Sequence, residues 1–104
     1  MSKYEVLIRS INRLFTNHSV RPWSERSAEW ITNLPGDDDR QGWIQHAQSV
    51  LSAYGGMGSI NDVYISPQAG DAISDDIRII RKVNQELKTL VGELYSEAMR
   101  LSRQ

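Results

Sequence analysis

The chain has 104 residues, of which 39% are hydrophobic, and its formal net charge is −1 at neutral pH. A chain of this length forms one domain, so we expect residues 1–104 to share a single core. The absence of cysteine excludes disulfides, thiolate metal sites and a cysteine nucleophile, and the net charge argues against a general nucleic-acid binder, which usually carries a basic stripe.

The first predicted helix covers residues 3–17. Apolar side chains recur there at the i, i+3, i+4, i+7 spacing of one helical face: Tyr4, Leu7, Ile8, Ile11, Leu14 and Phe15. Charged residues interrupt the segment, so it lacks the apolar run of a signal peptide, and no run approaches the ~18–20 apolar residues that span a bilayer. We therefore expect a cytoplasmic protein that does not enter a membrane.

A short second helix is predicted over residues 24–34, between Pro22 and Pro35. Its apolar contacts are expected from Trp23, Ala28, Ile31 and Leu34. Trp30 falls on a different face and is therefore the best candidate among the tryptophans for an exposed aromatic anchor in a protein interface. Packing of Trp30 at the boundary of the core is nevertheless the favoured interpretation.

The third predicted helix starts at Asp37, Asp38 and Asp39, because carboxylates favour the positive end of a helix dipole. Its apolar stripe consists of Trp43, Ala47, Val50, Leu51 and Tyr54. Gly55 is expected to end the helix, as a residue that adopts positive φ readily. His46, beside Gln45 and Gln48, is expected at the surface or at the boundary of the core.

No catalytic or metal-binding set can be assembled from the sequence. Consecutive carboxylates such as Asp37–Asp39 diverge on a helix start, so we interpret them as solvated, with a contact patch for a basic partner as the alternative. His18 and His46 lack zinc-site spacing, and no serine stands in a nucleophile elbow. We therefore expect a protein that is not an enzyme and has no cofactor or metal ion.

The segment Tyr54–Asp62 holds three of the seven glycines within four residues. It is predicted to end the third helix and turn tightly, with Met57 and Ile60 packed inward and with Asn61 and Asp62 bonded to the backbone. A phosphate-binding nest is the second interpretation, but the lysine of a phosphate loop is missing and a helix, not a strand, precedes. Recognition of this loop by another protein is the third.

Residues 63–65 are β-prone but too few for more than a lone strand, and Pro67 and Gly70 keep the chain irregular up to Ser74. A long helix follows over residues 75–102, with Ser74 as its cap. Its apolar seam suggests a homodimer through this helix as an alternative function: Ile77, Ile80, Val83, Leu87, Leu90, Val91, Leu94, Ala98 and Leu101. Its basic residues are expected on a solvated face, with ion pairs Lys82–Glu86 and Glu97–Arg100. Together the segments predict an all-α, irregular four-helix bundle with a loop-rich segment at 55–74.

The run Leu51–Ile65 carries a Gly-Gly-Met-Gly-Ser-Ile-Asn-Asp motif and resembles a small uncharacterised bacterial family of helical proteins. The likeness has specificity over residues 25–66 and includes the Trp-rich segment. Such proteins resemble immunity or accessory proteins encoded beside bacterial toxins. No enzymatic activity and no catalytic residue come with the resemblance.

Acidic charge is concentrated in residues 22–39 (five acidic and one basic side chain) and in residues 62–76 (four acidic and no basic side chain). Complementary charge raises association rate and specificity, so we expect these segments to face a basic protein partner. The expected function is a non-catalytic, immunity-type protein that neutralises a cognate toxin by occlusion. A small-ligand binder that uses the glycine segment is a third possibility, after the homodimer. The expected partner-contacting residues are Trp30, Asp37, Asp38, Asp39, Asp62 and Asp71.

Overall fold

The computed structural model describes residues 1–104 and contains helices and irregular segments but no strand. In chain order the elements are α1 (Lys3–Asn17), α2 (Trp23–Thr32), α3 (Arg40–Leu51), the 3₁₀ turns η1 (Ile60–Asp62) and η2 (Pro67–Ala69), and α4 (Ile77–Ser102). The predicted all-α fold with four helices and a long C-terminal helix is confirmed. Residues 63–65 do not form the lone strand that their composition allowed.

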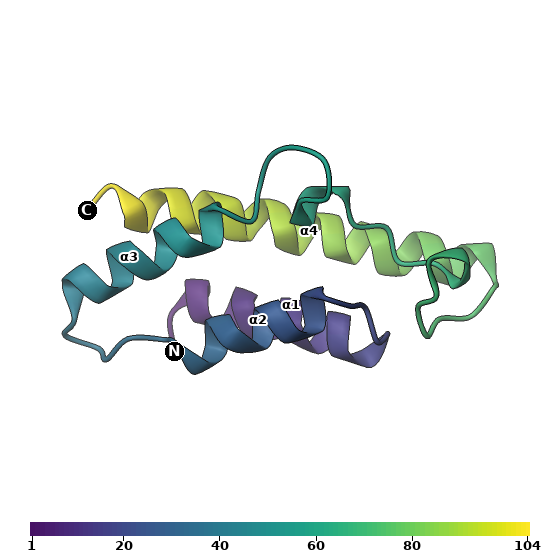
Figure 1. The fold of residues 1–104 in the computed structure, drawn as a ribbon, viewed down its shortest axis with the longest axis horizontal. Coiled ribbons are helices and arrows are strands. Elements are labelled where there is room, and N and C mark those ends of the chain that lie inside the picture. Colours follow the sequence, from purple (N-terminus) through teal and green to yellow (C-terminus); the bar gives the residue numbers. More distant parts are fainter.

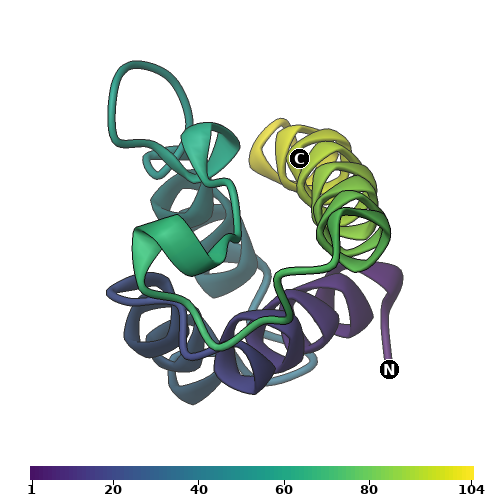
Figure 2. The ribbon, with the colours of Figure 1, turned by 90° about the vertical axis from the view of Figure 1, so that its right-hand side faces the viewer.

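Helix α4 runs along the length of the molecule, whose principal extents are 45 × 23 × 20 Å (Figure 1). Helices α1 and α2 form an antiparallel pair below it, and α3 lies beside its C-terminal half. Both α1 and α3 pack against α4, whereas α2 packs against α1. The end-on view in Figure 2 shows the loop between α3 and η1 standing out from the body.

Helix α1 buries the predicted face. All six of its expected apolar residues are buried. The Ser2 hydroxyl caps the helix by accepting a hydrogen bond from the Glu5 N–H at 3.2 Å. The expectation succeeds here because α1 lies between α2 and α4, so that one continuous apolar stripe serves both neighbours.

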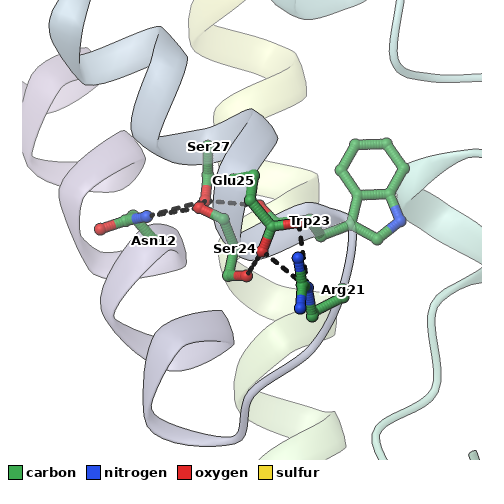
Figure 3. Close-up of polar contacts among 6 residues, drawn as sticks. All are labelled: Asn12, Arg21, Trp23, Ser24, Glu25 and Ser27. Carbon is green, nitrogen blue, oxygen red and sulfur yellow. Dashed lines mark hydrogen bonds and ion pairs between the residues drawn. The ribbon is translucent and has the colours of Figure 1, made fainter.

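Helix α2 buries only part of the predicted face. Of the predicted residues, Trp23 is buried, Ile31 and Leu34 are partly buried against the core and Ala28 is exposed. Ser27 and Trp30, at i+4 and i+7 from Trp23, are buried as well. Because the middle residue of this buried stripe is a serine, hydropathy alone does not identify the stripe. Ser27 is fully buried yet satisfied, since its hydroxyl donates to the Trp23 carbonyl (2.7 Å) and accepts from Asn12 Nδ2 of α1 (3.0 Å; Figure 3).

Helix α3 is shorter than predicted at both ends. It begins at Arg40, and Asp39 is its N-cap, with Oδ1 accepting from the Gly42 N–H at 3.0 Å. It ends at Leu51, several residues before Gly55, because the chain tightens into a bond from the Tyr54 N–H to the Leu51 carbonyl (3.0 Å). Only then does Gly55 take its positive φ of 85°.

Helix α4 begins at Ile77, and its cap is Asp76 rather than Ser74. The apolar seam of α4 packs into the core of the same chain, where its buried residues are Ile80, Leu87, Val91, Leu94 and Ala98. The exposed part is the N-terminal turn, where Ile77 and Ile79 are about half exposed. Of the two expected ion pairs, Glu97–Arg100 forms at 3.1 Å, whereas Lys82 and Glu86 make none. None of the helices combines the length and hydropathy that crossing a bilayer requires.

Candidate functional site

The structure does not bring the six predicted partner-contacting residues together. The link between α2 and α3, which carries Asp37, Asp38 and Asp39, lies at the end of the molecule where both chain termini lie (Figure 1). The η2 turn, which Asp71 follows closely, lies at the opposite end, beside the start of α4. The two acidic segments therefore do not form one surface.

The expectation of an exposed anchor at Trp30 is wrong. The side chain is only 8% exposed and belongs to the core cluster. Its burial follows from the face that α2 presents to α1, which Trp30 shares with Trp23 and Ser27.

Three of the predicted carboxylates are engaged by the local backbone. Asp39 caps α3. Asp62 accepts a hydrogen bond from the Gly58 N–H at 3.1 Å, and Asp71 accepts one from the Ser66 N–H at 3.0 Å. These side chains stabilise turns, which leaves Asp37 and Asp38 as the predicted acidic residues whose carboxylates make no hydrogen bond or ion pair within the chain.

Asp37 and Asp38 line a hollow of about 370 Å³ together with Trp43, which we call the Trp43 hollow. The start of α1, the link before α3 and the last turns of α4 form its walls. Trp43 is partly exposed, contacts the Tyr4 ring edge-on with 6.2 Å between centroids, and donates from Nε1 to the Gly36 carbonyl at 2.8 Å. Trp43, expected in the core, is thus the tryptophan that an approaching partner can reach.

The charges around the Trp43 hollow are mixed but mainly acidic. Asp37 and Asp38 line it directly, and the capping Asp39 follows them. Of the two lining arginines, Arg100 is paired with Glu97 at 3.1 Å, whereas Arg40 has no ion partner. The local surface therefore carries three carboxylates against one unpaired guanidinium.

His46 is buried, whereas it was expected at the surface or at the boundary of the core, and it joins three helices. Its Nε2 lies 2.8 Å from the Trp30 carbonyl of α2, and its Nδ1 lies 2.7 Å from the Tyr4 hydroxyl of α1. Because a carbonyl only accepts, Nε2 carries a proton and donates it to the Trp30 carbonyl. Both ring nitrogens are thus engaged within the chain, and neither is free for a metal ion or a substrate.

The pKa values of two phenols, the buried Tyr4 and the half-buried Tyr54, are raised. Burial raises the pKa of Tyr4 above its ordinary value, and the nearby Tyr54 raises it further. Burial also raises the pKa of Tyr54, with a smaller contribution from Tyr95. The Tyr54 hydroxyl donates to the Val91 carbonyl at 2.7 Å, so it links the turn that follows α3 to the middle of α4.

In the glycine segment, Gly55, Gly56 and Gly58 all adopt left-handed backbone with φ near +80°. Ile60 is buried as expected, but Met57 is fully exposed at the tip of the loop, so the prediction for Met57 is wrong. The polar prediction is confirmed, since Asn61 accepts from the Gly55 N–H at 3.3 Å and Asp62 from the Gly58 N–H. These bonds occupy N–H groups that a phosphate nest would need.

The cluster at the start of α2 contains a serine, a carboxylate and an arginine but no histidine (Figure 3). The Ser24 hydroxyl donates to Glu25, and Arg21 pairs with the same carboxylate at 3.3 Å. Ser24 and Arg21 lower the pKa of Glu25, which makes this exposed carboxylate a weak proton acceptor. Elsewhere in the structure no three His, Asp or Glu side chains gather as a metal site.

Neither a curated protein nor a solved structure matches the chain. One family does match, over residues 17–74, which are more than half of the chain and include α2, α3 and the glycine segment but not α4. This range contains residues 25–66, on which the resemblance seen in the sequence rested. The chain belongs to this family, which is described as a domain of unknown function, DUF6966.

Proposed function

We propose that this protein is a non-catalytic protein-binding domain, and most concretely a bacterial immunity protein that neutralises a cognate toxin by occluding it. The observation that supports the proposal best is the Trp43 hollow, where an accessible aromatic ring lies beside two carboxylates without partners. Aromatic side chains in hollows are the usual anchors of protein interfaces. Unpaired carboxylates beside them favour a basic partner surface.

The mechanism follows from the chemistry of this surface. Asp37 and Asp38 steer a basic toxin surface during diffusional encounter, and a side chain of the toxin enters the hollow against Trp43. The bound domain then covers the toxin surface and performs no reaction itself. The internal position of His46 is consistent with a domain that binds without catalysing a reaction. The histidine supports the ring of Tyr4, which lines the hollow, and is not presented to a partner.

The experiment is affinity capture from the native host followed by a growth assay. The captured protein is expressed in a test bacterium with and without the wild-type domain, and the same assay is repeated with Asp37→Lys/Asp38→Lys. We expect the wild-type domain to restore growth and the double variant to fail, with a lower association rate between the purified proteins that also falls as salt is added.

The matched control is Glu29→Lys/Glu93→Lys, which makes the same change in charge at two exposed residues outside the Trp43 hollow. It is expected to restore growth like the wild type. A captured partner that does not inhibit growth, or equal protection by both double variants, would contradict the proposal.

A further inference from the structure

A groove of about 700 Å³ lies between α4 and residues 60–64, on a surface separate from the Trp43 hollow. We call it the α4 groove. Its apolar lining includes Val63 and Tyr64 on one wall and Leu87 and Val91 on α4. Tyr64 is 55% exposed, so its ring offers apolar surface that the chain itself does not cover.

The α4 groove is fixed in shape before anything binds to it. Asn84 of α4 donates to the Ile65 carbonyl (2.8 Å) and accepts from the Ile65 N–H (2.7 Å) at one end of the wall. Tyr54 is bonded to the Val91 carbonyl at the other end. An occupant therefore does not have to pay the entropy of ordering this wall, which favours binding.

The charged residues lining the α4 groove are all of one sign. They are Arg81 and Lys88, and no carboxylate lines the groove. Neither side chain forms an ion pair within the chain. This is opposite in sign to the Trp43 hollow, so the two surfaces suit different partners.

The spacing of the two cations restricts the occupant further. Arg81 and Lys88 are seven residues apart on α4, which is two turns or ~10.5 Å. This distance separates the two backbone positions from which the cationic side chains extend. An occupant that carries two anionic groups about two turns apart matches this spacing and can pair with both cations at once.

Gly92 at the end of the α4 groove has no packing role within this chain. A Cβ added there would meet no atom within 4 Å, and glycine inside a helix costs about 1 kcal/mol relative to alanine. The missing side chain keeps the surface of α4 low at this point. A low helix surface allows the backbone of a second helix to approach closely.

We propose that the α4 groove binds an acidic amphipathic helix of a partner protein. The helix lays its apolar face against Val63 and Tyr64, above the largely buried Leu87 and Val91 that form the floor of the groove, and passes over Gly92. Carboxylates two turns apart on its flank pair with Arg81 and Lys88. This is the helix-in-groove mode of recognition, with apolar anchors for affinity and flanking charge for specificity.

The probe is a fluorescein-labelled synthetic peptide of about four helical turns, with a leucine stripe and glutamates at the flanking positions two turns apart. Its matched control carries lysine at the same positions. Fluorescence anisotropy is expected to show that the full chain binds the glutamate peptide at least about tenfold more tightly than the lysine peptide. In Arg81→Glu/Lys88→Glu, this preference should disappear or reverse.

Two further variants test the site itself. Lys82→Glu/Arg103→Glu changes charge equally at exposed residues outside the α4 groove and should keep the wild-type preference. Gly92→Leu should lower the affinity for the glutamate peptide by about tenfold or more, because the added side chain blocks the close approach of a second helix. Circular dichroism establishes that each variant is folded.

The proposal is overturned if neither peptide binds, if both bind equally, or if the control double variant loses as much affinity as Arg81→Glu/Lys88→Glu. A labelled single-stranded oligonucleotide that binds through Arg81 and Lys88 while the peptides do not would also overturn it, in favour of a nucleic-acid site. The Asp37→Lys/Asp38→Lys variant should bind the glutamate peptide normally, so failure of the immunity proposal and failure of this one are distinguishable.

Discussion

At the scale of single residues, His46 is a buried polar side chain that makes hydrogen bonds to two other helices. It satisfies the Tyr4 hydroxyl and the Trp30 carbonyl, and the latter lies in the last turn of α2, where carbonyls lack an intrahelical donor. The local signal for this role is weak, because a lone histidine among polar neighbours resembles a surface residue. Only the meeting of α1, α2 and α3 places it inside.

Replacing His46 with leucine should lower the free energy of unfolding by about 2–3 kcal/mol, because two buried polar groups lose their partner. Urea unfolding followed by circular dichroism measures the change. His18→Leu is the control, because that side chain is partly exposed and its carbonyl partner, Ala72, is also exposed; it should cost less than His46→Leu. Equal losses for the two variants would contradict the structural role assigned to His46.

The glycine segment depends on backbone conformation at single positions. Gly56 has a φ of 82° and open space around the position of a Cβ, so alanine there is strained without clashing. Gly56→Ala should destabilise the fold by about 1–2 kcal/mol, the ordinary cost of left-handed backbone for a residue with a side chain. Gly36→Ala, where φ is not left-handed and the added Cβ only reaches ordinary contact, should leave the urea midpoint nearly unchanged.

At the scale of elements, the helices differ in how far hydropathy predicts their buried face. In α1 every predicted apolar residue is buried, because two neighbours share one apolar stripe. In α2 the buried stripe includes Ser27, whose hydroxyl is satisfied by the backbone and by Asn12. A polar residue that bonds within the helix it belongs to can replace an apolar one, and periodicity alone does not reveal this.

Gly92→Ala should raise the stability of the free protein by about 1 kcal/mol, since Gly92 lies inside α4 and a methyl group meets no other atom. The urea midpoint should increase at constant slope. A decrease would mean that the position is already packed in solution, for example against a second copy of the chain. Sedimentation of the wild-type protein would then show association.

At the scale of the whole molecule, the phenols of Tyr4 and Tyr54 predict a loss of stability at alkaline pH. The pKa values of Tyr4 and Tyr54 are raised in the fold, whereas in the unfolded chain a tyrosine titrates near pH 10. Above about pH 10 the unfolded state therefore binds fewer protons than the folded state, and stability falls as pH rises. Below that pH both states hold these protons, and the two phenols make their full contribution to the free energy of unfolding.

Urea unfolding at intervals from about pH 8 to pH 11 measures this dependence. We expect the slope above pH 10 to be smaller in Tyr4→Phe/Tyr54→Phe than in the wild type, even though the double variant is less stable overall. The comparison uses slopes, so the hydrogen bonds lost with the two hydroxyls do not affect it. Identical slopes would show that the two phenols ionise alike in the folded and unfolded chain.

The four helices, the buried face of α1 and the bonds of Asn61 and Asp62 in the glycine segment could be predicted from the amino-acid sequence, because periodicity, capping and turn chemistry act within a few residues. The sequence did not determine the burial of Trp30 and His46, the reach of Trp43 toward solvent or the separation of the two acidic segments. Those depend on which helix lies against which, and that choice minimises exposed apolar surface over the whole chain. The two candidate binding surfaces, of opposite charge, also exist only after that packing.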